Sequence, residues 1–283
     1  MDILNKLTGE IIWSTSSEQL AGLDLTEANL ANADLNGMDL SHCDLRFADL
    51  TGANLSKSNL QHADLRGAHI CESDLSGANL SAVTAGSDRP SEAATLCNSN
   101  LSGATLDNAD LRSVDLHEAD MKNCHCQDTD FSNANLNRAN LSNSQLIHCM
   151  MTNSYMRNAD LSEANLSGSH LNEANMVHAC LDKANLAKDA DNHATILART
   201  HLREASFIDA NLSGSVLRMA DLRGANLRNA NLSGALVGGA VMRAANVSGA
   251  DFANVKLDTA TVVHSNFSQA INVNMPDYKT GWR

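Results

Sequence analysis

Two groups of side chains in this sequence have the residue types of a reactive site. Cys124, His125 and Cys126 are consecutive, and thiolates and imidazoles are the ligands that zinc prefers. His42 and His62 form the second group, twenty positions apart. The sequence contains none of the short motifs of serine hydrolases, zinc proteases or phosphate-binding loops.

A five-residue repeat determines how these side chains are positioned. Ala-Asp-Leu and variants such as Ala-Asn-Leu recur with an apolar residue at every fifth position. A short fixed period is typical of a solenoid, and a period of five fits neither a continuous helix nor a continuous strand. We predict that this central residue and the small residue two positions before it point inward. The first central residues are Leu25, Leu30, Leu35, Leu40, Leu45, Leu50, Leu55, Leu60 and Leu65.

The repeat phase argues against chemistry at either group. Cys124 takes the small inward position and Cys126 the central one, whereas His125 points outward, so the three cannot bind one ion. His42 and His62 fall in one outward column and could share a metal only with a ligand from outside the chain. Because a convex repeat surface offers no water-excluding pocket, we predict no enzyme activity, no catalytic residue, no metal and no cofactor.

The repeat resembles that of the pentapeptide repeat proteins over roughly residues 20–267. The resemblance implies an all-β fold, a right-handed quadrilateral parallel β-helix with four pentapeptides in each coil. It also implies about eleven to twelve coils of about twenty residues, with a spacing of about 4.8 Å. We expect an N-terminal β-hairpin cap over residues 1–19, a single β-helix over 20–275 and a tail over 276–283.

The phase of the repeat slips twice, and each slip predicts an extruded loop or a bulge. Central residues run to Leu80, resume at Leu96, and after Leu186 are assigned to Ile196 and Leu202. We therefore expect loop insertions near 81–95 and 187–201. Loops on a rigid scaffold often carry function. The candidate partner contacts in these loops are Asp88, Arg89, Glu92, Lys188, Asp189 and Asp191.

Acidic side chains form a column when positions one coil apart are compared. Asp24, Asp44 and Asp64 are predicted to stack, with a spacing of the same order as that of DNA phosphates. Such a column could imitate a DNA backbone. The alternative is that aspartate occurs at this position because it bonds to the turn backbone.

Basic and apolar side chains also form columns in the last third of the chain. Arg203, Arg223 and Arg243 are predicted to stack, and they would bind an acidic partner or pair with neighbours such as Asp221. Apolar residues also take the outward position that elsewhere holds aspartate or asparagine, and they would form a contact surface or pack beneath a loop. These residues are Val216, Leu236 and Val241.

Composition narrows the functional classes. The net charge is −13, which is not typical of a nucleic-acid binder. Residues 201–283 nevertheless hold more basic than acidic side chains. No signal peptide and no apolar run of membrane-spanning length is visible. The seven cysteines include no pair one coil apart at the same repeat position, so we expect reduced thiols and a cytoplasmic protein.

These observations predict a non-enzymatic scaffold that binds a protein partner through its acidic surface or its loops. We expect a monomer or an end-to-end homodimer through the C-terminal coils, and no binding to nucleic acid or membrane. The family resemblance adds an alternative, because some pentapeptide repeat proteins mimic DNA, bind DNA gyrase or topoisomerase IV, and protect it from quinolones or toxins.

Overall fold

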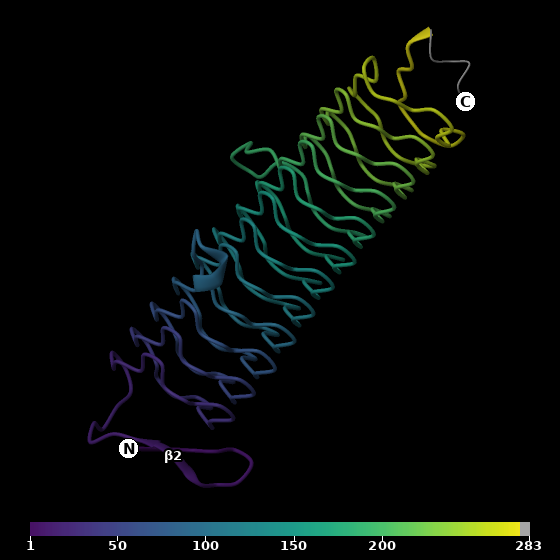
Figure 1. Cartoon of the computed structure of the whole chain (residues 1–283). Coiled ribbons are helices and arrows are strands. Elements are labelled where there is room, and N and C mark those ends of the chain that lie inside the picture. The colour runs from purple at the N-terminus through teal and green to yellow at the C-terminus, as the bar shows by residue number, and fades with distance from the viewer. Residues whose placement is uncertain (278–283) are drawn as a thin grey trace. The chain divides into compact units, whose positions relative to one another are not determined.

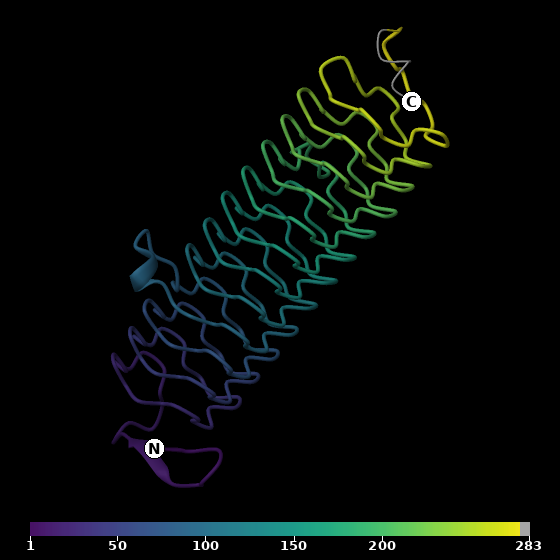
Figure 2. The ribbon, with the colours of Figure 1, turned by 45° about the vertical axis from the view of Figure 1, so that its right-hand side comes forward.

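The computed structural model describes residues 1–277 and divides into two compact units, unit 1 over Met1–Leu141 and unit 2 from Ser142 onward. The named elements are strand β1 (Asp2–Leu4), strand β2 (Ile11–Ser14) and the short 3-10 helix η1 (Pro90–Glu92). Elsewhere the described chain alternates turns with single-residue parallel bridges. Within each unit it winds into stacked coils (Figures 1 and 2).

Each coil is joined to the next by parallel backbone hydrogen bonds between residues about one coil apart. Asp24 bridges Asp44, and Asp44 in turn bridges Asp64. The N–H of Leu25 donates to the carbonyl of Asp44 at 2.7 Å, and the N–H of Asp44 donates to the carbonyl of Leu23 at 3.0 Å. Outward side chains twenty positions apart therefore stack at the ordinary strand spacing of about 4.8 Å.

A tight turn follows each central residue and explains the polar residue before it. After Leu25, the N–H of Ala28 donates to the Leu25 carbonyl at 3.0 Å, and Glu27 has φ 57°. A left-handed residue at this third position is what a type II turn requires. The Asp24 carboxylate accepts the N–H of Thr26 at 3.0 Å. Aspartate and asparagine suit this position because their side chains bond to a turn backbone two residues on.

Both inward positions are buried. Leu45 at a central position and Ala48 at a small position are completely shielded from solvent. The largest buried side chains are phenylalanines at central positions, Phe131, Phe207 and Phe252. Burying one such apolar side chain contributes about 1.5–3 kcal/mol. The stability of each unit therefore depends on a narrow core that repeats from coil to coil.

The N-terminal hairpin is bonded to the first coil of unit 1. Strands β1 and β2 pair antiparallel, with Ile3 opposite Trp13. The N–H of Asp34 donates to the carbonyl of Leu4, and the N–H of Lys6 donates to the carbonyl of Asn32, both at 2.8 Å. The hairpin thereby pairs with coil backbone that has no preceding coil to bond, which protects a sheet edge.

The first insertion lies within a single turn of unit 1. Thr84 bridges Asp110, so this coil has twenty-six residues instead of twenty. Ser87 still makes the ordinary bond to the carbonyl of Arg112 at 3.1 Å, and the N–H of Ala94 donates to the carbonyl of Ala85 at 2.8 Å, the bond that closes a regular turn. The six additional residues are therefore Asp88–Ala93, which we call loop 1 and which contain η1.

The second insertion has the same construction in unit 2, and it corrects the assigned repeat phase. Leu197 is fully buried, whereas Ile196 bridges His170 and Val216 in the outward position. The expectation that Ile196 is a central residue is thus wrong by one position. Lys188 keeps the ordinary bond to the carbonyl of Ser213 at 3.2 Å. The six additional residues are Asp189–Ala194, which we call loop 2.

One pair of cysteines also differs from the sequence-based expectation. Cys71 and Cys97 form a disulfide, with a Cα–Cα distance of 4.6 Å and a sequence separation of 26. The prediction that all seven thiols are reduced is wrong for this pair. Comparing positions twenty apart missed it because the six residues of loop 1 lie between the two cysteines. The remaining cysteines are Cys43, Cys124, Cys126, Cys149 and Cys180.

At the C-terminal end, only Pro276 and Asp277 of the predicted tail 276–283 fall within the described residues. Val255 and Val262 continue the buried core close to that end. Within residues 1–277, no helix is long and apolar enough to cross a membrane. An end-to-end homodimer through these coils stays a prediction.

Deleting Asp88–Ala93 is expected to leave the thermal stability nearly unchanged. Ser87 would then be followed directly by Ala94, which restores the regular order of positions in a twenty-residue coil. We expect a change in melting temperature of no more than a few degrees, about what 1 kcal/mol produces, measured by circular dichroism. As a control, deletion of 98–103 removes six residues of the coil wall and misaligns the core, so it should abolish folding of unit 1. A comparable collapse after deletion of loop 1 would contradict this assignment.

Candidate functional site

The predicted acidic column exists as a stack, but arginines compensate most of its charge. Arg46 lies 2.6 Å from Asp44 and 3.7 Å from Asp64. Arg66 pairs with Asp64 at 2.5 Å. The hydrogen bond from the Arg46 side chain lowers the pKa of Asp44 to about 2. The column Asp24, Asp44 and Asp64 is therefore a row of ion pairs over much of its length.

The turn interpretation of these aspartates has direct support. The carboxylate of Asp44 accepts the backbone N–H of Arg46 at 3.2 Å, and that of Asp64 accepts the N–H of Arg66 at 3.1 Å. The Asp-Leu-Arg sequence thus forms a small local unit in which one carboxylate binds both the turn and the guanidinium. The same unit recurs at Asp110 and Arg112, at 2.8 Å.

In loop 1, the three predicted contact residues bond to one another or to the coil wall. Arg89 pairs with Glu92 at 2.9 Å. Asp88 pairs with Arg112 at 2.5 Å, and Arg112 also bonds to Asp110. The first pair lies within the loop, and the second ties the loop to the following coil, which carries Arg112.

In loop 2, Asp189 rather than Lys188 or Asp191 organises the site. Its carboxylate bonds to His148 Nε2 at 2.6 Å and to His193 Nδ1 at 2.8 Å. These hydrogen bonds hold the pKa of Asp189 well below its usual range, with the contact to His148 the largest cause, and Asp189 in turn raises the pKa of His193. Lys188 Nζ donates to the side-chain oxygen of Asn192 at 2.5 Å, whereas Asp191 is exposed.

Sequence reasoning missed both histidines of this cluster. His148 and Asp189 are 41 residues apart. This separation is one residue more than two coils, so a comparison of positions twenty residues apart does not relate them. The other histidine pair, His42 and His62, stacks with ring centroids 4.9 Å apart. Parallel rings direct their nitrogens edgewise rather than toward one point, so this pair forms no pocket for an ion.

The predicted arginine column in unit 2 is partly compensated. Arg203 Nε lies 3.0 Å from Asp221, and Arg223 also pairs with Asp221. Arg243 has no ion pair among the described residues, because Val241 replaces aspartate two positions before it. Arg203, Arg223 and Arg243 together line a shallow hollow of about 280 Å³.

A column of apolar side chains in the outward position runs beside these arginines. Ile196 bridges Val216, and Val216 bridges Leu236, so the three side chains stack outward in consecutive coils of unit 2. We call Ile196, Val216 and Leu236 the apolar column. Leu236 is 45% exposed. Arg218 follows Val216 by two positions and, like Arg243, forms no ion pair within the described chain.

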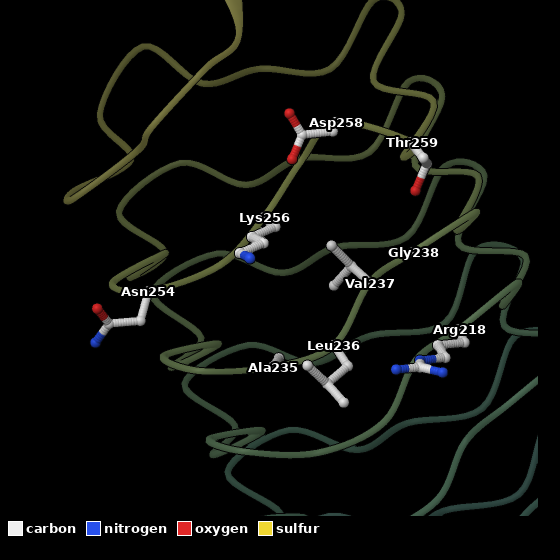
Figure 3. A pocket seen from close by; sticks show the side chains of 9 residues that line it. All are labelled: Arg218, Ala235, Leu236, Val237, Gly238, Asn254, Lys256, Asp258 and Thr259. Atoms are coloured by element: carbon white, nitrogen blue, oxygen red, sulfur yellow. The ribbon is translucent and has the colours of Figure 1, made fainter.

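The apolar column ends at an open pocket of about 560 Å³ (Figure 3). Leu236 lines it from one coil, Lys256 and Asp258 from the next, and Arg218 lies at its edge. Here the wall is irregular: among the described residues no bridge joins Leu236 to the following coil, and the N–H of Gly239 donates instead to the Thr259 hydroxyl at 3.1 Å. The resulting surface combines apolar side chains with cationic groups.

Family comparison agrees with this architecture. The family model described as pentapeptide repeats matches in several copies, which cover residues 19–84, 92–186 and 195–258. The chain therefore belongs to the pentapeptide repeat family, whose fold is the right-handed β-helix. A search of curated proteins finds no match.

Several solved structures are similar to this chain. HetL, a pentapeptide repeat protein involved in heterocyst differentiation regulation from the cyanobacterium Nostoc sp. strain PCC 7120, is 30% identical, with 87% of this chain and 92% of HetL covered and a TM-score of 0.25. QnrB1, a plasmid-mediated fluoroquinolone resistance protein, is 16% identical, with coverage of 73% and 83% and a TM-score of 0.33. Rfr23 from the cyanobacterium Cyanothece 51142 is 28% identical over 41% of this chain and 63% of Rfr23, with a TM-score of 0.20.

Replacing Arg46 with Gln is expected to raise the pKa of Asp44 from about 2 toward its ordinary 3.8. Because the folded-state pKa is depressed, this carboxylate contributes stability above about pH 4, and the contribution disappears as the pH falls through about 2. The effect on the melting temperature at neutral pH should be small, since the pair is exposed to solvent. A carboxyl NMR titration measures the shift, with Arg89→Gln as the control. An unchanged pKa of Asp44 in Arg46→Gln would refute the assigned cause.

Proposed function

We propose that this chain is a non-catalytic interaction protein and that unit 2 binds a protein segment through the apolar column and the adjoining pocket. The observation that carries the proposal is the replacement of aspartate by valine or leucine in the outward positions. This substitution places apolar side chains at the surface, where Leu236 is exposed and Val216 is half-buried. It also leaves Arg218 and Arg243 without the carboxylate that accompanies Arg46, Arg66 and Arg112.

The chemistry of this surface specifies the kind of partner. A stack of apolar side chains at the surface that ends in the exposed Leu236 indicates a contact site, and a pocket beside it suits an inserted apolar side chain. The charged groups that line the same pocket are Arg218, Lys256 and Asp258, and the excess of positive charge favours a carboxylate. We therefore propose a partner segment in which apolar residues are flanked by aspartate or glutamate.

Selection of peptides from a phage-displayed random library on the immobilised full chain tests this proposal. Peptides with alternating acidic and apolar residues should be enriched. The combined change Val216→Ser, Leu236→Ser and Arg218→Ser should weaken their binding at least tenfold, because hot-spot residues each contribute more than about 1 kcal/mol. All three side chains lie on the outer surface, and circular dichroism checks that the variant folds.

The matched control is Phe47→Asn, which removes an exposed apolar side chain from unit 1 and keeps a residue type that tolerates the left-handed conformation. It should bind the selected peptides as the wild type does. Equal binding of those peptides to the triple variant, or no enrichment at all, would refute a binding site on unit 2.

A second candidate function is DNA mimicry toward DNA gyrase or topoisomerase IV. The stacked carboxylates of Asp24, Asp44 and Asp64 favour it, but Arg46 and Arg66 weigh against it because they neutralise two of the three. QnrB1 adds no argument at this identity and TM-score.

A supercoiling assay with purified gyrase, with and without a quinolone, separates the two functions. We expect neither inhibition nor drug rescue at micromolar protein, because the acidic column is largely compensated. Inhibition that disappears when Asp88–Ala93 and Asp189–Ala194 are deleted would instead establish DNA mimicry and locate its contacts in the loops.

A further inference from the structure

Three potential metal ligands converge at loop 2. His148 Nε2 and His193 Nδ1 both contact the same Asp189 oxygen, Oδ2, at 2.6 and 2.8 Å. One ligand atom from each residue lies within 4.8 Å of the others. The two imidazole rings are perpendicular, with centroids 5.6 Å apart, so that they approach the carboxylate from different directions.

The coil wall positions His148 for this contact. His148 occupies the third position of a turn, with φ 58°, and its ring lies over Gly168 of the next coil. A Cβ atom at Gly168 would be 2.4 Å from His148 Cδ2. Glycine at that position therefore leaves the space through which the imidazole reaches loop 2.

The backbone of loop 2 positions the other two ligands. The N–H of Asp189 donates to the carbonyl of His193 at 3.0 Å, and the N–H of His193 donates to Asp189 Oδ1 at 2.7 Å. Asp189 Oδ1 is thus fixed by the backbone while Oδ2 faces both imidazoles. The Asp189 side chain is only 10% exposed, whereas that of His193 is 64% exposed, so solvent reaches the cluster from the side of His193.

We propose that His148, Asp189 and His193 bind a divalent transition-metal ion, with Zn²⁺ the best match. Two imidazole nitrogens and one carboxylate oxygen are a ligand set that zinc accepts at about 2.0–2.2 Å, with the fourth position left to water or to a partner's side chain. Tetrahedral ligands at that distance are about 3.3 Å apart. The present contacts of 2.6 and 2.8 Å need to widen by only about half an ångström.

The neighbouring charges are compatible with a cation. Asp191 lies near His193 and adds a second carboxylate to the same loop. The Lys188 ammonium is engaged by the Asn192 side chain. Imidazole ligands select against Ca²⁺ and Mg²⁺, which prefer oxygen, and the order of affinities among transition metals predicts that Cu²⁺ and Ni²⁺ compete with zinc. Bound metal would fasten loop 2 to the coil wall directly before Ile196, at the start of the apolar column.

Isothermal titration calorimetry of the chelator-treated full chain with ZnCl₂ tests the site. We expect one strongly bound Zn²⁺ per chain. His148→Ala and His193→Ala should each weaken binding at least tenfold, since even indirect partners of metal ligands contribute 10- to 100-fold in affinity. His62→Ala is the matched control and should leave the affinity unchanged. Titration with Co²⁺ should give the visible absorption of a tetrahedral site in the wild type, and this absorption should be lost in His148→Ala and in His193→Ala.

A second variant separates metal binding from folding. Deleting Asp189–Ala194 restores a twenty-residue coil while it removes two of the three ligands, so the protein should fold and the Zn²⁺ site should be absent. Zinc binding that survives this deletion or the double change His148→Ala, His193→Ala would overturn the proposal, as would the absence of binding in the wild type. Peptide selection on metal-free protein reports on the proposed function independently.

Discussion

The backbone hydrogen bonds between successive coils are the interaction on which the rest of the structure depends. Most outward residues are bonded on both sides, as Asp44 is to the coils that carry Asp24 and Asp64. In most of the turns between two such residues the third member is left-handed, as at Glu27. With backbone and turns constrained in this way, a side chain's place on the surface follows from its position in the repeat, and columns of like residues result.

The repeat made much of the fold predictable from the sequence. Alternating leucine and alanine at fixed spacing identified the inward residues from phase alone, whereas the coil of four pentapeptides was implied by the family resemblance. Prediction failed at the two insertions, because there the number of residues in a coil no longer matches the twenty-residue period of the repeat. Ile196 was assigned to the central position that Leu197 occupies, because the exact six residues of loop 2 cannot be located without the turn bonds that flank them. The disulfide of Cys71 with Cys97 was missed for the same reason at loop 1.

The candidate sites were less predictable, because neither the net charge nor the position of a side chain in a column reveals which side chains form ion pairs. The sequence correctly stacks Asp24, Asp44 and Asp64, yet their electrostatic character depends on Arg46 and Arg66, which fold back onto the same column. In unit 2 the opposite occurs. The charge of Arg218 is not compensated by an ion pair among the described residues, because Val216 stands where the aspartate would be. The cluster of His148, Asp189 and His193 depends on the path of an irregular loop, for which a repeat sequence gives no rule.

Both insertions interrupt the repeat at the same point, between the third residue of a turn and the small residue that starts the next unit. Ser87 and Ala94 keep their ordinary bonds although six residues separate them, and Lys188 keeps its bond before loop 2. Register is thus independent of chain length at this point. The corners that carry loops 1 and 2 are accordingly positions where foreign sequence can be grafted and displayed on the scaffold while the core sequence stays the same.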